Sequence, residues 1–245
     1  MKWLVRVGCW ACLAAVAWGP GAAWSAPAPP RPVPSRPVPD AVQKAINQLR
    51  DPNPQTREAG AFALAQMGLE AVPALEALVD VLRQDSNPRV SELAAYALGH
   101  LGPDGQEAVG PLIAALKDKR GGVRALAAQA LGSPFYGPAD RIVPALIAAL
   151  DDKEDAPRRQ AARALGTYRA KAHKAIPRLT DLLDDRCPLT RGDAAWSLGE
   201  IGEEAAAAVP TLIELAKDSD PYIAERATMA VKKIDPKAAE RAGIK

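Results

Sequence analysis

Residues 94–99 read AAYALG, and the hexapeptide returns as AAQALG at 127–132, AARALG at 161–166 and AAWSLG at 194–199. Such an Ala/Gly string has two interpretations: a glycine loop around a ligand, or a packing surface that recurs in every structural repeat. Successive strings begin 33 or 34 residues apart, and no strand pattern precedes them. Periods of roughly 20 to 50 residues are typical of repeat proteins. The string therefore predicts a repeat architecture.

Two columns of apolar residues extend this register beyond residue 40. They are Leu64, Leu98, Leu131, Leu165, Leu198 and Val231, and then Leu78, Leu112, Leu146, Leu179 and Leu212. Around each column, apolar residues recur three or four positions apart, as on one face of an α-helix. Prolines mark helix starts, with Pro144, Pro177 and Pro210 expected in the first turn of each second helix. Each unit is therefore predicted to be a helical hairpin, and the fold class to be all-α, a right-handed α-solenoid of about six hairpins.

A third column is acidic and is followed by a basic one. Thirteen residues before each member of the first apolar column stands an aspartate: Asp51, Asp85, Asp118, Asp152, Asp185 and Asp218. Six residues after these aspartates stand Arg57, Ser91, Arg124, Arg158, Arg191 and Ala224. An aspartate in the turn before a helix can accept backbone N–H groups, and an arginine in the first turns can reach an aspartate of its own or the neighbouring repeat. These columns predict a ladder of ion pairs that fixes the stacking of repeats.

The hairpin, the Asp-then-Arg offset and strings such as VPALIAALDD (143–152) resemble HEAT repeats, and most closely the HEAT-like repeats named after the phycobilisome lyases. The resemblance covers roughly residues 40–235. It implies that the Asp and Arg columns are structural, and that the ladder is interrupted at Ser91 and at Ala224. For function it implies little, because such repeats occur in scaffolds, lyase subunits, metal hydroxylases and some DNA-repair enzymes.

The N-terminus has the pattern of a secretory signal peptide. Lys2 and Arg6 precede an apolar run from Val7 to Trp18, which is too short to span a bilayer. We expect a signal peptide over 1–25, a Pro-rich linker over 26–39 in polyproline II conformation, and a HEAT-like repeat domain over 40–245. The protein is thus expected to be exported, periplasmic or secreted, with no membrane span after signal removal; an uncleaved N-terminal anchor is the alternative.

Charge favours a protein partner over nucleic acid. Removal of residues 1–25 leaves equal numbers of basic and acidic residues, which argues against a general nucleic-acid binder. Residues 117–178, however, hold 13 basic and 6 acidic residues between acidic flanks. Within this segment we expect Arg141, Lys174 and Arg178 to form an anion-accepting patch on the second helices, for a protein or peptide partner with an acidic patch. An ordinary solvated basic surface is the alternative.

The repeat is irregular at GSPFYGPADR, residues 132–141, where Phe135 and Tyr136 replace the usual ending. One interpretation is an aromatic contact with a partner beside Arg141. The other is packing, with Phe135 in the slot taken elsewhere by Leu101 and Ile201.

No catalytic or metal-binding constellation is evident, and no cofactor is expected. His100 and His173 are isolated, and Cys187 stands in the turn DDRCPLT without a histidine nearby in the sequence. The sequence therefore favours an exported, non-catalytic HEAT-repeat scaffold that mediates protein–protein interaction. The alternative is a chromophore-lyase-like enzyme or a lyase subunit.

Overall fold

The computed structural model describes residues 37–133 and 137–244. The predicted signal peptide, most of the Pro-rich linker, Phe135 and Tyr136 lie outside this range. The chain divides into two units, Met1–Pro37 and Val38–Lys245, and the second contains all the described helices.

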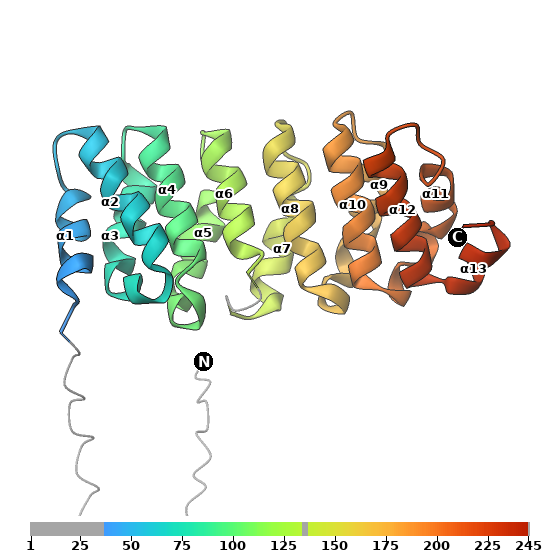
Figure 1. Cartoon of the computed structure of the whole chain (residues 1–245), viewed down its shortest axis with the longest axis horizontal. Helices are drawn as coiled ribbons and strands as arrows, with labels where there is room; N and C mark the ends of the chain where they lie inside the picture. Colours follow the sequence, from blue (N-terminus) through green and yellow to red (C-terminus); the bar gives the residue numbers. More distant parts are fainter. Residues whose placement is uncertain (1–36, 134–136, 245) are drawn as a thin grey trace, which may run out of the picture. The chain divides into compact units, whose positions relative to one another are not determined.

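The described residues form helices and no strand, so the predicted all-α solenoid is confirmed (Figure 1). An inner layer consists of α2 (Pro54–Met67), α4 (Pro88–Gly99), α6 (Gly121–Leu131), α8 (Asp155–Thr167), α10 (Pro188–Ile201) and α12 (Pro221–Ile234). An outer layer consists of α1 (Asp40–Gln48), α3 (Leu75–Gln84), α5 (Val109–Ala115), α7 (Ala139–Ala149), α9 (Ile176–Asp181) and α11 (Val209–Leu215). The short 3-10 segments η1 (Gly68–Ala74), η2 (Gly102–Ala108), η3 (Arg169–Ala175) and η5 (Glu203–Ala208) lead from an inner helix to the next outer one, η4 (Leu182–Asp184) continues α9, and α13 (Pro236–Arg241) follows α12.

The hairpins close across the aspartate turns. Each outer helix packs most extensively on the inner helix that follows it, as α3 packs on α4 and α11 on α12. The units are therefore α1–α2 to α11–α12, six in number as predicted, but shifted by one helix from the pairing that the sequence suggested. The turns around residues such as Asp85 are short, so they bring consecutive helices together antiparallel, whereas the 3-10 segments move the chain on to the next hairpin.

The third hairpin connection departs from the proline prediction. Pro177 and Pro210 are the second residues of α9 and α11, as expected, but Pro144 lies inside α7. Helix α7 begins earlier, at Ala139, directly after Pro138. A proline removes one backbone donor wherever it stands in a helix.

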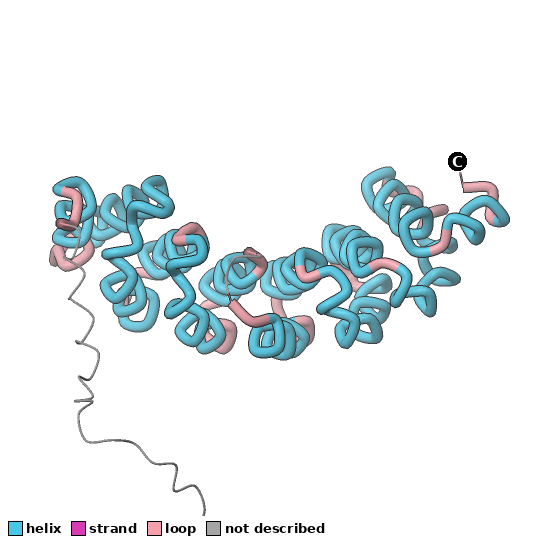
Figure 2. Tube along the Cα trace, turned by 90° about the horizontal axis from the view of Figure 1, so that it is seen from below, coloured by secondary structure: helices cyan, strands magenta, loops and turns pink. Residues whose placement is uncertain are grey.

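The Ala/Gly string explains how the layers are spaced. Every member of both apolar columns is 0% exposed, so these side chains fill the space between the layers. Ala94, Ala128 and Ala161 are also completely buried, and successive inner helices pack closely while outer neighbours such as α3 and α5 touch little. Small side chains permit interaxial distances near the short end of about 8–10 Å. Close packing on one side only bends the row of helices, with the inner layer on the concave side (Figure 2).

One helical stretch in the described residues, Pro54–Gln84, is long and apolar enough to cross a membrane. It comprises α2, η1 and α3, and its Leu64 and Leu78 are buried in the core, which is the ordinary place of such residues in a solenoid.

Candidate functional site

The ion pairs of the ladder lie along the edge where the hairpins turn. Nε and Nη2 of Arg57, Arg124 and Arg158 hold the carboxylate of the next turn's aspartate at 2.6–2.9 Å. Nη1 of each donates to the carbonyl oxygen of the aspartate in its own turn, at 2.7–3.0 Å. Each arginine therefore joins two successive hairpins by bonds of fixed, bidentate geometry.

Each aspartate of the column also orders its own turn. One carboxylate oxygen accepts the backbone N–H two residues later, at 2.8–2.9 Å; the six aspartates are Asp51, Asp85, Asp118, Asp152, Asp185 and Asp218. Burial pushes the pKa of Asp85 upwards, but hydrogen bonds from Arg57 and from the Asn87 N–H outweigh burial and hold this pKa below its ordinary value. The pKa values of Asp152 and Asp185 are lowered for the same reasons.

The expected gap at Ser91 is filled by an arginine from the next turn. Arg120 holds Asp118 in its own turn through Nε and Nη2, both at 2.8 Å. Its Nη1 donates to Ser91 Oγ at 2.8 Å and to the carbonyl oxygen of Asp85 at 3.0 Å, and its Nη2 also donates to the carbonyl oxygen of Leu82 at 3.2 Å. The ladder is therefore continuous in the second repeat, with the cation approaching from the opposite side.

The ladder weakens toward the C-terminus. Arg191 donates to the Asp185 carbonyl oxygen at 3.1 Å but approaches Asp218 only to 3.6 Å. Ala224, which has no side-chain donor, ends it. The charged side chains of Arg57, Asp85, Asp118, Arg120, Arg124, Asp152, Arg158 and Asp185 are thus paired within this edge, which leaves little of their charge for a ligand.

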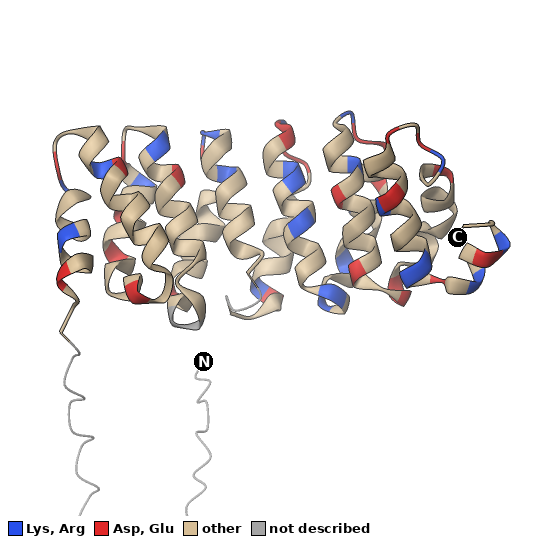
Figure 3. Ribbon diagram, viewed as in Figure 1, with Lys and Arg blue, Asp and Glu red and all other residues tan. Residues whose placement is uncertain are grey.

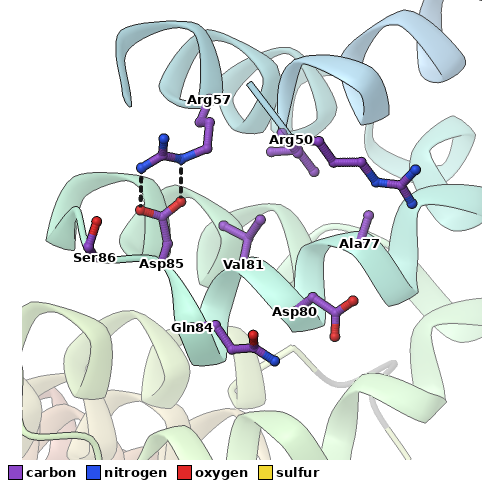
Figure 4. A pocket seen from close by; sticks show the side chains of 9 residues that line it. Arg50, Arg57, Ala77, Asp80, Val81, Gln84, Asp85 and Ser86 are labelled. Atoms are coloured by element: carbon purple, nitrogen blue, oxygen red, sulfur yellow. Dashed lines mark hydrogen bonds and ion pairs between the residues drawn. The ribbon is translucent and has the colours of Figure 1, made fainter. Parts of the chain in front are cut away.

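A hollow of about 360 Å³ adjoins the ladder between α1 and α3 (Figure 4). The Arg57–Asp85 pair forms one wall, and Arg50 and Asp80 lie at its rim, with Val81 between them. Two of its charged side chains, Arg57 and Asp85, are already paired with each other, whereas Arg50 and Asp80 form no ion pair with the described residues.

Two further hollows lie on the concave face. One, of about 290 Å³, is lined from α4 and α6, and its side chains include Tyr96, His100, Leu126, Gln129 and Ser133. The other, of about 250 Å³, is lined from α6 and α8 by Gln129, Gln160, Arg163 and Thr167 over Gly132 and Ala164. Gln129 and Gly132 belong to both, so the hollows adjoin and run across three inner helices.

The Ala/Gly string itself makes these hollows. A Cβ added to Gly99 would lie 2.9 Å from the Cβ of Ala130, and one added to Gly132 would lie 2.9 Å from the Cβ of Ala164. The helices are thus in close contact at these glycines, and the floor between them carries only small side chains such as those of Ala130 and Ala164. Side chains one turn away stand as walls on either side.

The side chains that wall the hollows are polar and aromatic, and several of them have no partner among the described residues. The side chains of Gln129, Gln160 and Arg163 form no hydrogen bond or ion pair with any described residue. Tyr96 is half-buried, and its ring lies 4.2 Å from the ring of His100, centroid to centroid. Half-buried Trp196 continues the row on α10. Figure 3 shows basic residues along the concave side of α8, beside a middle part of α4 and α6 that carries few charges.

The predicted outer patch is only partly free. Arg141 and Lys174 are exposed and form no ion pair with the described residues. Arg178, however, is ion-paired with Asp151 in the preceding turn and with Asp181 on its own helix, the latter at 2.9 Å. The patch thus presents two free cations. Phe135 and Tyr136 lie outside the described residues, and Tyr168 occupies the slot of Leu101 and Ile201 in the following repeat, donating to the Leu131 carbonyl oxygen at 2.6 Å.

The concave site could have been found in the sequence. The hexapeptide is nearly constant except at its third position, which reads Tyr96, Gln129, Arg163 and Trp196 in successive repeats. A position that varies inside a constant packing motif faces away from the packing. The signal was therefore present in the opening string, in the letters that change.

Residues that could bind a metal or act in covalent catalysis are dispersed. Within residues 37–133 and 137–244 no group of three or more His, Cys, Asp or Glu side chains could hold a metal ion. Cys187 is a free thiol directly before α10, and its backbone N–H donates a hydrogen bond to the Asp185 carboxylate. His100 and His173 bond to backbone carbonyl oxygens of Tyr96 and Ala170.

Comparison with known proteins places the fold among repeat proteins. The model of HEAT repeats matches residues 75–142 and 143–232, more than half of the chain, and that of the PBS lyase HEAT-like repeat matches 56–81. No curated protein sequence matches. Among 224 matching solved chains, an engineered protein is 23% identical, with a TM-score of 0.62 over 80% of this chain and 96% of that one. A chain from the complex of CpcE and CpcF of phycocyanin lyase from Nostoc sp. PCC7120 is 24% identical, with a TM-score of 0.61 over 85% of this chain and 83% of that one.

Proposed function

The chain belongs to the HEAT-repeat family, and we propose that it is a non-catalytic scaffold whose concave inner layer holds a segment of a partner protein. The observation that carries the proposal is the pair of adjoining hollows that share Gln129, walled by side chains without partners inside the chain. Solenoids use such extended concave surfaces for binding. Exposed polar side chains without a partner inside the chain can exchange their hydrogen bonds to water for hydrogen bonds to a bound segment.

The test compares two surfaces of the full chain. Gln129→Arg places a long side chain at the point that both hollows share, and the matched control Gln66→Arg makes the same change at an exposed position of α2 that lines neither hollow. Proteins captured by the unmodified chain from its native envelope fraction should be lost with Gln129→Arg and retained with Gln66→Arg. Retention of the same proteins by both variants would refute the concave site.

The outer patch is a second proposed surface. Arg141 and Lys174 are free to meet an acidic partner, and Arg178 would have to leave Asp151 and Asp181 to join them. Glutamate at all three positions should abolish binding of any partner that uses this patch. Undiminished capture by that triple variant, together with loss in Gln129→Arg, would assign the interaction to the concave face alone.

Export is part of the proposal and rests on the N-terminal sequence. Lys2 and Arg6 before a short apolar run, followed by Ala23-Trp24-Ser25, support signal cleavage near residue 25 and release of the repeat domain into the periplasm or medium. N-terminal sequencing of the protein from its native host should find a mature chain beginning close to Ala26. A chain that begins at Met1 in the cytosolic fraction would contradict this.

A lyase-related role is the second candidate, supported by the likeness of fold to a chain of the phycocyanin lyase complex. This role predicts that the purified protein binds a bilin and changes its absorption spectrum. An unchanged spectrum at protein excess would remove this candidate and leave the scaffold.

A further inference from the structure

We infer that the concave face recognises a polyproline II segment that places an acidic side chain at Arg163 and apolar side chains at Tyr96 and Trp196. This inference rests on the proposed function and adds the conformation and chemistry of the partner. It follows from three properties of the inner layer: its charge, its aromatic residues and its spacing.

Arg163 is the charged residue among those that line the two hollows. Its side chain is exposed on α8 and has no ion-pair partner among the described residues. The nearby carboxylate of Asp193 is only 4% exposed and already accepts the Tyr222 hydroxyl at 3.0 Å, with Arg159 at 3.6 Å. The charge of Arg163 is therefore unopposed at the mouth of a hollow, where an acidic side chain would complement it.

Aromatic side chains occupy the same register position as this cation in other repeats. Aromatic residues make up only 4% of the chain, yet Phe62, Tyr96 and Trp196 all occupy the third position of the hexapeptide register. A Cβ added to Gly166 would lie 2.6 Å from Trp196 Cζ3, so the indole lies over α8, on the side of Arg163. Half-buried aromatic rings of this kind bind proline and other apolar side chains.

The spacing selects the conformation. Closely packed helices lie about 8–10 Å apart, and polyproline II advances about 3.1 Å per residue with three residues per turn, or about 9 Å per turn. Every third residue of such a segment therefore faces the same way, at about the distance expected between closely packed neighbouring helices. Tyr96 and Arg163 are two repeats apart and Arg163 and Trp196 one, so the contacts correspond to about six and three residues. A β-strand alternates its side chains with period two and does not match.

The glutamines suit the backbone of this conformation. Polyproline II has no internal hydrogen bonds, so its carbonyl oxygens need donors from the surface. The free side-chain amides of Gln129 and Gln160 stand beside Arg163 and provide such donors.

The chain's own Pro-rich segment is an unsuitable occupant. Residues 26–39 contain Arg31 and Arg36 and no acidic residue, so their charge repels Arg163. The occupant is accordingly a segment of another protein.

The probes are fluorescein-labelled synthetic peptides of the sequence LPPSPPEPPF and its reverse, which carry the six- and three-residue spacings in both chain directions. Binding to the full chain is followed by fluorescence anisotropy. We expect one direction to bind, replacement of its Glu by Gln to weaken it about fivefold, and replacement by Lys to weaken it further. Moving the Glu by one residue should weaken it as much as removing it.

A charge reversal provides the decisive arm. Arg163→Glu should prefer the Lys peptide over the Glu peptide, while the matched control Arg83→Glu, at an exposed cation on the outer helix α3 that forms no ion pair with the described residues, should keep the original order. Thermal unfolding by circular dichroism confirms that both variants are folded.

Several results would overturn the inference. They are no binding of either peptide, no preference for Glu, an unchanged order in Arg163→Glu, or tighter binding of a peptide with the sequence of residues 26–39. If the natural partner is still lost with Gln129→Arg, these results would leave the proposed function standing and remove only the polyproline II acidic segment. Retention of the partner by Gln129→Arg would remove both.

Discussion

Truncation of Arg120 tests whether a residue outside the regular column replaces the missing arginine at position 91. Arg120→Ala removes the two bonds to Asp118 and the bonds to Ser91 Oγ and to the carbonyl oxygens of Asp85 and Leu82. Ser91 is 0% exposed, so its hydroxyl would keep only long contacts, at 3.3 and 3.5 Å, to the carbonyl oxygens of Val81 and Asp85.

The magnitude follows from burial. The side chain of Arg120 is 16% exposed and that of Asp118 19%, so solvent replaces little of what is lost. Removing one partner of such a network costs about 2–4 kcal/mol in free energy of unfolding. The control is Arg89→Ala, whose side chain is 59% exposed and whose ion pairs with Glu58 and Glu92 are 3.7 and 3.4 Å long. That change should cost about 0–1 kcal/mol.

The assay is urea unfolding followed by circular dichroism, and a rescue variant sharpens it. Ser91→Arg in the Arg120→Ala background restores the regular column, and the new side chain should reach Asp118 as Arg57 reaches Asp85. It should recover most of the lost stability. Equal losses in Arg120→Ala and Arg89→Ala, or no recovery in the double variant, would refute the reasoning.

Three further perturbations have defined outcomes. Ala161→Leu, at a position that is 0% exposed in α8, should overpack the inner layer and cost about 1–3 kcal/mol; an unchanged midpoint of thermal unfolding would contradict it. Acidification should destabilise the fold, because Asp85, Asp152 and Asp185 have folded pKa values below the ordinary 3.8. Their contribution is complete above that value and is lost as the pH falls through the folded pKa values, so urea midpoints should decrease below about pH 4. Tyr168→Phe leaves the Leu131 carbonyl oxygen without its 2.6 Å donor and should cost about 1–2 kcal/mol, measured by the same unfolding experiment.

The fold could be predicted because its signals are local and repeated. The residues of the two apolar columns, such as Leu98 and Leu112, recur once in each repeat, and all of them are buried because every repeat packs in the same way. The predicted pairing of helices was wrong by one step. Apolar residues have similar spacing in the α-helices and in the 3-10 connectors, so this spacing does not show which two neighbouring helices form a hairpin. Only the tight turn at residues such as Asp85 shows it. Arg120 was missed because it stands two residues after an aspartate, outside the offset that identified the ladder.

The site was harder to predict because the hollows depend on glycines, which have no side chain, rather than on conspicuous residues. The sequence drew attention to clustered cations, but Arg178 is neutralised by Asp151, which lies in the preceding turn and 27 positions away in the chain. The hollows arise where Gly99 and Gly132 omit side chains, and the walls come from the one position of the hexapeptide that varies. A search for unusual single residues misses this position, because its variation is visible only when the repeats are aligned with one another.

Site-specific photo-crosslinking tests the concave surface most directly. A photoreactive amino acid is placed at Gln129, which lines both hollows, and in a second protein at Arg141, which is exposed on the outer helix α7. Illumination of the native envelope fraction should join a partner to position 129 and not to position 141. A partner joined to position 141 and absent from position 129 would contradict the concave site.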